Sequence, residues 1–179
     1  MVYIILGTGF EESEAVVPCD LLRRCGVEVK FAGIGGRAVT GSHGIVIEAD
    51  CIAEETDLAS AEMLVLPGGL RGVKTIRSTP FVLSAVKTLY EKGGYVAAIC
   101  AAPTILGDLG ILQGRKAICY PGMEDGLTGA EVLHAPAVRD GNVITGRAAG
   151  AAFDFGLKLV ETLCGPEAAK KAAAGVVFP

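Results

Sequence analysis

The sequence of 179 residues has no tryptophan, only two histidines and no long apolar run. Its longest apolar stretches, residues 2–6 and 95–105, are too short to cross a bilayer, whose core of about 30 Å needs roughly 20 apolar residues. The amino terminus enters a strand-like run directly, without the basic segment and cleavage site of a secretory signal. We therefore expect a cytoplasmic protein that does not bind a membrane.

Charge and cysteine patterns exclude further classes of protein. The chain has 16 Lys and Arg residues against 20 Asp and Glu residues and no basic cluster, so nucleic acid is not an expected partner. No cysteine belongs to a Cys-x-x-Cys pair or lies at ligand spacing from a histidine, so neither a disulfide framework nor a metal site is expected. The six cysteines are Cys19, Cys25, Cys51, Cys100, Cys119 and Cys164.

Strand-like and helix-like patterns alternate along the chain, and 51% of its residues are hydrophobic, enough for a core. Apolar runs typical of buried strands occur at residues 2–6, 27–32, 62–67, 95–99, 116–119 and 143–145. Helical spacing of apolar residues occurs at 11–25, 79–92, 103–109, 150–164 and 167–174. The alternation predicts a doubly wound α/β sandwich with a mostly parallel sheet, and without any linker we expect a single domain over residues 1–179.

Residues 33–47 break this alternation. Short segments of strand-like residues flank Gly41-Ser42-His43-Gly44, which is typical of a β-hairpin. We expect the hairpin to be an antiparallel addition to the parallel sheet, with His43 exposed at its turn. The second histidine, His134, lies beside Ala135 and Pro136 and is predicted to have a local structural role.

Ligands of doubly wound sheets bind at the carboxyl ends of the strands. Three features are predicted to gather there: the helix start that carries Glu14, the Pro67-Gly68-Gly69 loop, and Cys100. A dinucleotide is not expected, because Gly7-Thr8-Gly9 lacks the third glycine of the phosphate-binding loop.

Cys100 is the strongest candidate for a reactive group. It lies where a buried strand meets a helix, among the small residues Ala97, Ala98, Ala101 and Ala102, which suit a sharp turn that holds a nucleophile clear of a sheet. The start of the following helix is expected to lower the pKa of the thiol. The alternative is that Cys100 is a small buried apolar residue, as free cysteines often are.

Two further groups could assist Cys100. A carboxyl at Glu14 could exchange a proton with the thiol if its own pKa were raised, although a surface position at the helix start is the simpler interpretation. Gly68 and Gly69 could offer backbone N–H groups to an oxyanion, or form an ordinary turn after a strand.

Three segments, in this order, closely resemble the ThiJ/PfpI superfamily: Phe10-Glu-Glu-Ser-Glu-Ala15, Pro67-Gly-Gly69 and Ala98-Ile-Cys-Ala-Ala-Pro103. They are most similar to the subfamily of the parkinsonism-associated deglycase and its bacterial relatives, and Arg147-Ala-Ala-Gly150 with Phe153-Asp-Phe155 resembles the closing segment of that subfamily. The similarity covers nearly the whole chain. Agreement among several independent segments makes the resemblance specific.

The resemblance implies a flavodoxin-like three-layer sandwich, a homodimer and chemistry without a cofactor or metal. It implies that Cys100 is the nucleophile, that Glu14 is the carboxylic acid that hydrogen-bonds the sulfur, and that Gly68, Gly69 and Ala101 supply oxyanion-binding N–H groups. The sequence departs from the family at Tyr120, where many members carry a histidine, and this makes a peptidase-type Cys–His pair doubtful. A second departure is Ala102, which often is glycine in the family.

On this basis we predict a cysteine-dependent glyoxalase or deglycase that acts on 2-oxoaldehydes or their early adducts in carbonyl and oxidative stress. Tyr120 is a possible pocket residue. The alternative is a non-catalytic redox sensor or chaperone whose Cys100 is oxidised to sulfinic acid and held by Glu14. For the homodimer, the first helix around Cys19 and the hairpin near Ile45 are the candidate contact surfaces.

Overall fold

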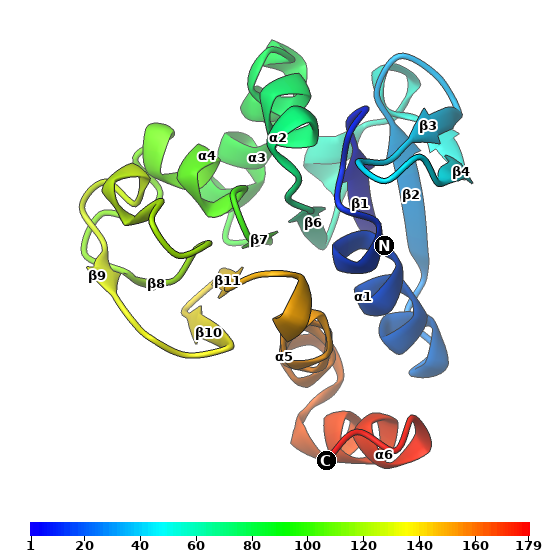
Figure 1. The fold of residues 1–179 in the computed structure, drawn as a ribbon, viewed down its shortest axis with the longest axis vertical. Coiled ribbons are helices and arrows are strands. Elements are labelled where there is room, and N and C mark those ends of the chain that lie inside the picture. Colours follow the sequence, from blue (N-terminus) through cyan, green and yellow to red (C-terminus); the bar gives the residue numbers. More distant parts are fainter.

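A computed structural model describes residues 1–179 and shows a seven-stranded sheet with helices on both faces (Figure 1). The strand order is β10-β11-β7-β6-β1-β2-β5, and every neighbouring pair is parallel except β10 with β11. The strands are β1 (Val2–Leu6), β2 (Val29–Gly33), β5 (Cys51–Ile52), β6 (Met63–Leu66), β7 (Tyr95–Ile99), β10 (Ala137–Asp140) and β11 (Val143–Gly146). The predicted flavodoxin-like α/β architecture is therefore confirmed.

The helices form the two outer layers because the central strands are apolar on both faces. In β1, Ile4 and Leu6 pack toward the layer that contains α1, α5 and α6, whereas Ile5 packs toward the layer that contains α2, α3 and α4. This two-faced burial explains why the strand is a continuous apolar run rather than an alternating one. The helices are α1 (Glu12–Arg24), α2 (Leu70–Arg77), α3 (Pro80–Glu91), α4 (Pro103–Asp108), α5 (Ala152–Cys164) and α6 (Pro166–Gly175).

The predicted hairpin exists, but its expected place was wrong. Strands β3 (Ala38–Thr40) and β4 (Val46–Glu48) pair only with each other and form a separate two-stranded sheet. The edge beside β2 is taken by β5, and the hairpin instead lies over the start of α1, where Gly9 N–H donates to Thr40 O at 2.8 Å and Ser42 N–H donates to Phe10 O at 2.8 Å. The hairpin turn therefore reaches the carboxyl ends of the central strands.

Smaller elements complete the chain. The predicted strand at 116–119 is the two-residue β8 (Lys116–Ala117), which pairs with β9 (Glu131–Val132) outside the main sheet. Short 3-10 turns occupy Ala53–Glu55, Leu58–Ser60, Glu124–Gly126 and Ala149–Ala151. No helix has the length and apolar character that a membrane crossing requires.

Candidate active site

Cys100 forms the sharp turn between β7 and α4. Its φ is 66°, in the left-handed region that residues other than glycine rarely adopt, at a cost of about 1–2 kcal/mol. Cys100 N–H donates to Gly146 O at 3.0 Å, and Tyr120 N–H donates to Cys100 O at 2.7 Å. The buried, small Ala98 and Ala101 leave room for the bend. The predicted elbow is confirmed, and the surrounding sheet holds it in its strained conformation.

Glu14 lies beside this elbow, in the first turn of α1, and its side chain is fully buried. Its Oε2 accepts a hydrogen bond from Gly68 N–H at 2.9 Å, and Oε1 has no hydrogen-bond partner. Burial raises the pKa of Glu14 to about 7, although hydrogen bonds from Gly68 N–H and the Cys100 thiol act to lower it. The surface position that the helix start alone suggested is therefore wrong, and near neutral pH this carboxyl readily exchanges a proton.

The thiol of Cys100 differs from expectation. Burial, and next the charge of the Glu14 carboxylate, raise the pKa of Cys100 to about 12, although the Gly69 and Ala101 N–H groups act to lower it. The predicted lowering by a helix start is wrong because α4 has only six residues and begins three positions later, at Pro103. The thiol is therefore protonated near neutral pH, and Glu14 is the ionisable group beside it.

The two glycines after β6 have different roles from each other. The Gly68 N–H is engaged by Glu14, so the expectation that it faces an oxyanion is not met. The N–H groups of Gly69 and Ala101 are hydrogen-bond donors to Cys100 Sγ and favour its charged form. A Cβ at Gly68 would lie 2.5 Å from Cys100 Cβ and 2.6 Å from Glu14 Oε2, so only glycine allows the thiol and carboxyl to meet there.

A pocket of about 700 Å³ opens above Cys100. Tyr120 is half-exposed and lines it, as the sequence suggested. Arg71 and His43 also line it, and no sequence pattern predicts that they belong to the site. His43 is exposed, as predicted, but it is a pocket residue rather than only a turn residue. The complete lining is Gly9, Glu11, Ser42, His43, Gly69, Leu70, Arg71, Cys100, Ala101, Tyr120, Pro121 and Met123.

His43 is held by the acidic start of α1. Its Nδ1 lies 2.9 Å from Glu12 Oε2, and its backbone N–H donates to Glu12 Oε1 at 2.7 Å. Burial acts to raise the pKa of Glu12, but hydrogen bonds from His43 and Ser42 outweigh it and lower the pKa to about 2. The hydrogen bond to Glu12 and the nearby charge of Glu11 raise the pKa of His43.

This cluster is also the group of residues that could supply metal ligands. A carboxylate oxygen of Glu11, a carboxylate oxygen of Glu12 and a ring nitrogen of His43 all lie within 4.8 Å of one another. Both Glu12 carboxylate oxygens already accept hydrogen bonds from His43 and Ser42, however. The cluster therefore acts as an anchor that fixes the hairpin turn to α1.

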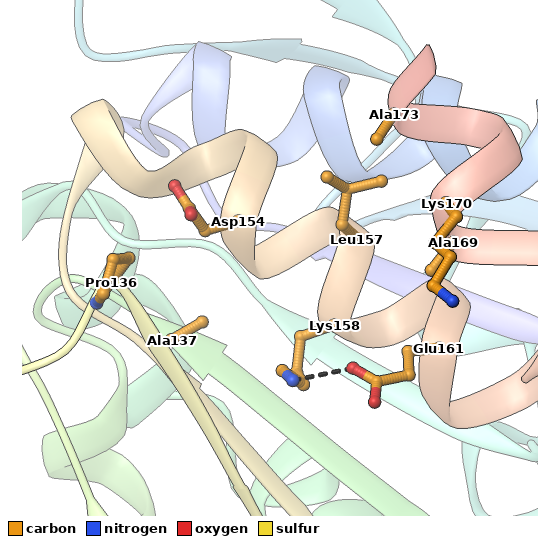
Figure 2. A pocket seen from close by; sticks show the side chains of 9 residues that line it. All are labelled: Pro136, Ala137, Asp154, Leu157, Lys158, Glu161, Ala169, Lys170 and Ala173. Carbon is orange, nitrogen blue, oxygen red and sulfur yellow. Dashed lines mark hydrogen bonds and ion pairs between the residues drawn. The ribbon is translucent and has the colours of Figure 1, made fainter. Parts of the chain in front are cut away.

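Another hollow lies between β10, α5 and α6 and has a volume of about 390 Å³ (Figure 2). There Lys158 and Glu161 of α5 form an ion pair at 2.6 Å. No thiol or histidine lines this hollow. This hollow therefore lacks the thiol and the imidazole that line the pocket above Cys100.

The chain is similar to known proteins over most of its length. The model of the DJ-1/PfpI family matches residues 1–162. Protein dj-1beta of Drosophila melanogaster is 37% identical over 177 residues, covering 97% of this chain and 95% of that protein. A protein of Pyrococcus abyssi named as a deglycase is 33% identical over 164 residues, covering 90% of this chain and 98% of that protein.

The fold comparison gives the same result. The crystal structure of a cysteine-to-alanine mutant of a DJ-1 superfamily protein from Salmonella typhimurium superposes with a TM-score of 0.94 at 33% identity, covering 99% of this chain and 98% of that one. Sequence and fold similarity therefore extend together over almost the whole chain. The chain belongs to the DJ-1/PfpI family.

Proposed function

We propose that the protein is a cofactor-free enzyme that converts 2-oxoaldehydes, or their early adducts on amines and thiols, to 2-hydroxy acids. The observation that carries this proposal is that the side chains of Cys100 and Glu14 meet beside Gly68. The pKa of Glu14, about 7, suits proton transfer near neutral pH. The relative from Pyrococcus abyssi that is named as a deglycase supports the same chemistry.

The first step joins the thiol to the aldehyde. The Glu14 carboxylate accepts the Sγ proton while Sγ attacks the aldehyde carbon, C1, and the C–O π electrons move to oxygen. The N–H groups of Gly69 and Ala101 stabilise this oxyanion, because both already point at Sγ. Glu14 then returns the proton to the oxygen, which gives a neutral hemithioacetal and a free carboxylate.

The second step moves hydrogen along the carbon chain. The Glu14 carboxylate removes the C1 hydrogen as a proton and leaves an enediolate whose charge lies on the C2 oxygen. The proton of the C1 hydroxyl group passes to that oxygen, and Glu14 delivers its own proton to C2. The product is a thioester of Cys100 with a 2-hydroxy acid, and water hydrolyses it to release the acid and the free thiol. With a glycated substrate, release of the amine or thiol from its carbinol adduct precedes attack on the freed aldehyde.

We also propose a homodimer formed through α1 and the hairpin. Val16, Ile45 and Val46 are exposed by 45%, 58% and 58%. Val16 of α1 and Ile45, which precedes Val46 at the start of β4, line the same surface hollow. Exposed apolar residues that cluster on one face are typical of an interface between subunits. This face adjoins the Glu12–His43 anchor, so dimer formation would also fix the hairpin turn at the pocket rim.

The test is turnover of methylglyoxal to lactate in metal-free buffer by the wild type, Cys100→Ser and the control Cys164→Ser. Cys164 is exposed and does not line the pocket. We expect turnover by the wild type and the control but not by Cys100→Ser. Turnover that survives in Cys100→Ser would refute the proposal.

The same three proteins separate the enzyme from a redox sensor. Cys100 is half-buried and accessible from the pocket, so peroxide can also reach it. Selective oxidation of Cys100 in a wild type that shows no aldehyde turnover would favour the sensor and reject the enzyme.

A further inference from the structure

The pocket above Cys100 contains one of the only two histidines of the chain. The segment around Tyr120 has no histidine, but His43 approaches the pocket from another element, the turn between β3 and β4. The pocket rim therefore contains an imidazole although the sequence around Tyr120 has none.

The structure fixes which nitrogen of His43 can act. Nδ1 is held by Glu12 Oε2 at 2.9 Å and lies 3.0 Å from Ser42 Oγ, which leaves Nε2 as the free ring nitrogen. A carboxylate that holds one imidazole nitrogen sets the tautomer and favours the protonated ring. The turn itself is closely packed, because a Cβ at Gly41 would lie 2.4 Å from Glu12 Cδ.

We propose that His43 is a catalytic residue that transfers protons to and from the substrate oxygens, and that Glu12 is its positioning residue. This inference rests on the proposed function. In that reaction Glu14 transfers the hydrogen between C1 and C2, and a second group is needed to transfer the proton between the two substrate oxygens. No other side chain in the pocket lining both can exchange a proton near neutral pH and is held in one orientation by a hydrogen bond.

The two carriers balance the enediol step. As Glu14 removes the C1 hydrogen of the hemithioacetal, the protonated Nε2 of His43 gives a proton to the C2 carbonyl oxygen, and the enediol forms. Glu14 then delivers its proton to C2, while neutral His43 takes the proton from the C1 hydroxyl group. The thioester results, and both residues return to their starting protonation states.

The charges around His43 support a protonated starting state. Glu11 Oε2 lies 3.6 Å and Glu12 Oε2 lies 2.9 Å from Nδ1, and the two residues are the N-cap and the first residue of α1. Arg71, from α2, also lines the pocket. The ion pairs of Glu11 and Glu12 are with His43 and not with Arg71. Tyr120 and Cys100 are the remaining titratable groups of the lining.

This arrangement predicts a bell-shaped dependence of kcat on pH. The rate rises as Glu14, with its pKa of about 7, becomes a carboxylate, and falls as His43 loses its proton at a pKa raised by Glu12 and Glu11. Each limb belongs to a different residue, so substitution of one residue should remove one limb.

The experiment measures kcat against pH for methylglyoxal with the wild type, His43→Gln, Glu12→Gln and the matched control His134→Gln. We expect His43→Gln to lose about 100-fold in kcat and to lose the falling limb while keeping the rising one. Glu12→Gln should move the falling limb to lower pH, and His134→Gln should match the wild type. Imidazole added to His43→Ala should restore part of the rate.

The outcomes separate this inference from the proposed function. An active wild type whose His43→Gln variant keeps both limbs and its full kcat would overturn the inference and leave the Cys100 chemistry intact. A falling limb that is lost in His134→Gln would overturn it as well. An inactive wild type would reject the proposed function and this inference together.

Discussion

Replacement of Glu14 by glutamine should make the protein more stable above neutral pH. Glu14 is fully buried, and its pKa is raised from 4.5 to about 7. At 1.36 kcal/mol per pKa unit, the ionised carboxylate costs the folded state about 3 kcal/mol. Glutamine keeps an acceptor for Gly68 N–H and removes the charge, but leaves an amide N–H without a full set of partners, which costs about 1–2 kcal/mol. The net gain is about 1–2 kcal/mol.

The sign of the effect depends on pH. Below 4.5 the carboxyl is protonated in both the folded and the unfolded chain, so the raised pKa costs nothing there. Between 4.5 and about 7 only the unfolded chain ionises, and the cost to the wild type grows to its full value. The advantage of Glu14→Gln over the wild type should therefore increase across this window and stay constant above it.

Thermal unfolding at pH 5 and pH 8 tests this reasoning, with the exposed Glu131→Gln as the control. At pH 8 we expect the Tm of Glu14→Gln to exceed that of the wild type by about 2–8 °C, since 1 kcal/mol shifts Tm by about 2–4 °C in a chain of this size. A wild type more stable than Glu14→Gln at pH 8, or a difference that does not change with pH, would refute the account of a destabilised carboxylate.

Three further outcomes are expected. Thr145→Val should cost about 1–3 kcal/mol in urea unfolding, because the buried Ile118 N–H donates to Thr145 Oγ1 at 3.0 Å; an unchanged midpoint would contradict this. Glu12→Gln should lower the pKa of His43 measured by NMR, with His134→Gln used for assignment; an unmoved pKa would show that Glu12 does not hold the ring. Val46→Asp should convert a dimer into monomers in light scattering, and a persistent dimer would exclude this face.

The sequence alone predicted the parts of the fold that local patterns determine. The apolar runs of β1, β6 and β7 indicated buried parallel strands, because a strand covered on both faces has no polar side. The small residues around Cys100 indicated a sharp turn, and φ at Cys100 confirms it. The hairpin was predicted from its turn, but its position depends on backbone hydrogen bonds to Gly9 and Phe10 that no local pattern reveals.

The electrostatics of the site could not be predicted in the same way. The pKa of Cys100 depends on its burial and on the Glu14 charge, and both follow from the packing of α1 against the elbow. His43 and Cys100 line the same pocket although they are 57 positions apart in the chain. The hairpin that carries His43 to this pocket was itself predicted in the wrong place. Helix α2 escaped prediction because its start at Leu70 follows Gly69 without a side-chain cap.

The central claim is that Glu14 transfers the hydrogen from C1 to C2 of the substrate while Cys100 Sγ is bonded to C1. The most direct measurement is methylglyoxal turnover by Glu14→Gln, with iodoacetamide labelling of Cys100 as proof that the thiol is still accessible. The account predicts at least about a 100-fold loss of kcat in a variant that is folded, labelled at Cys100 and more stable than the wild type at pH 8. Full turnover by Glu14→Gln would contradict it.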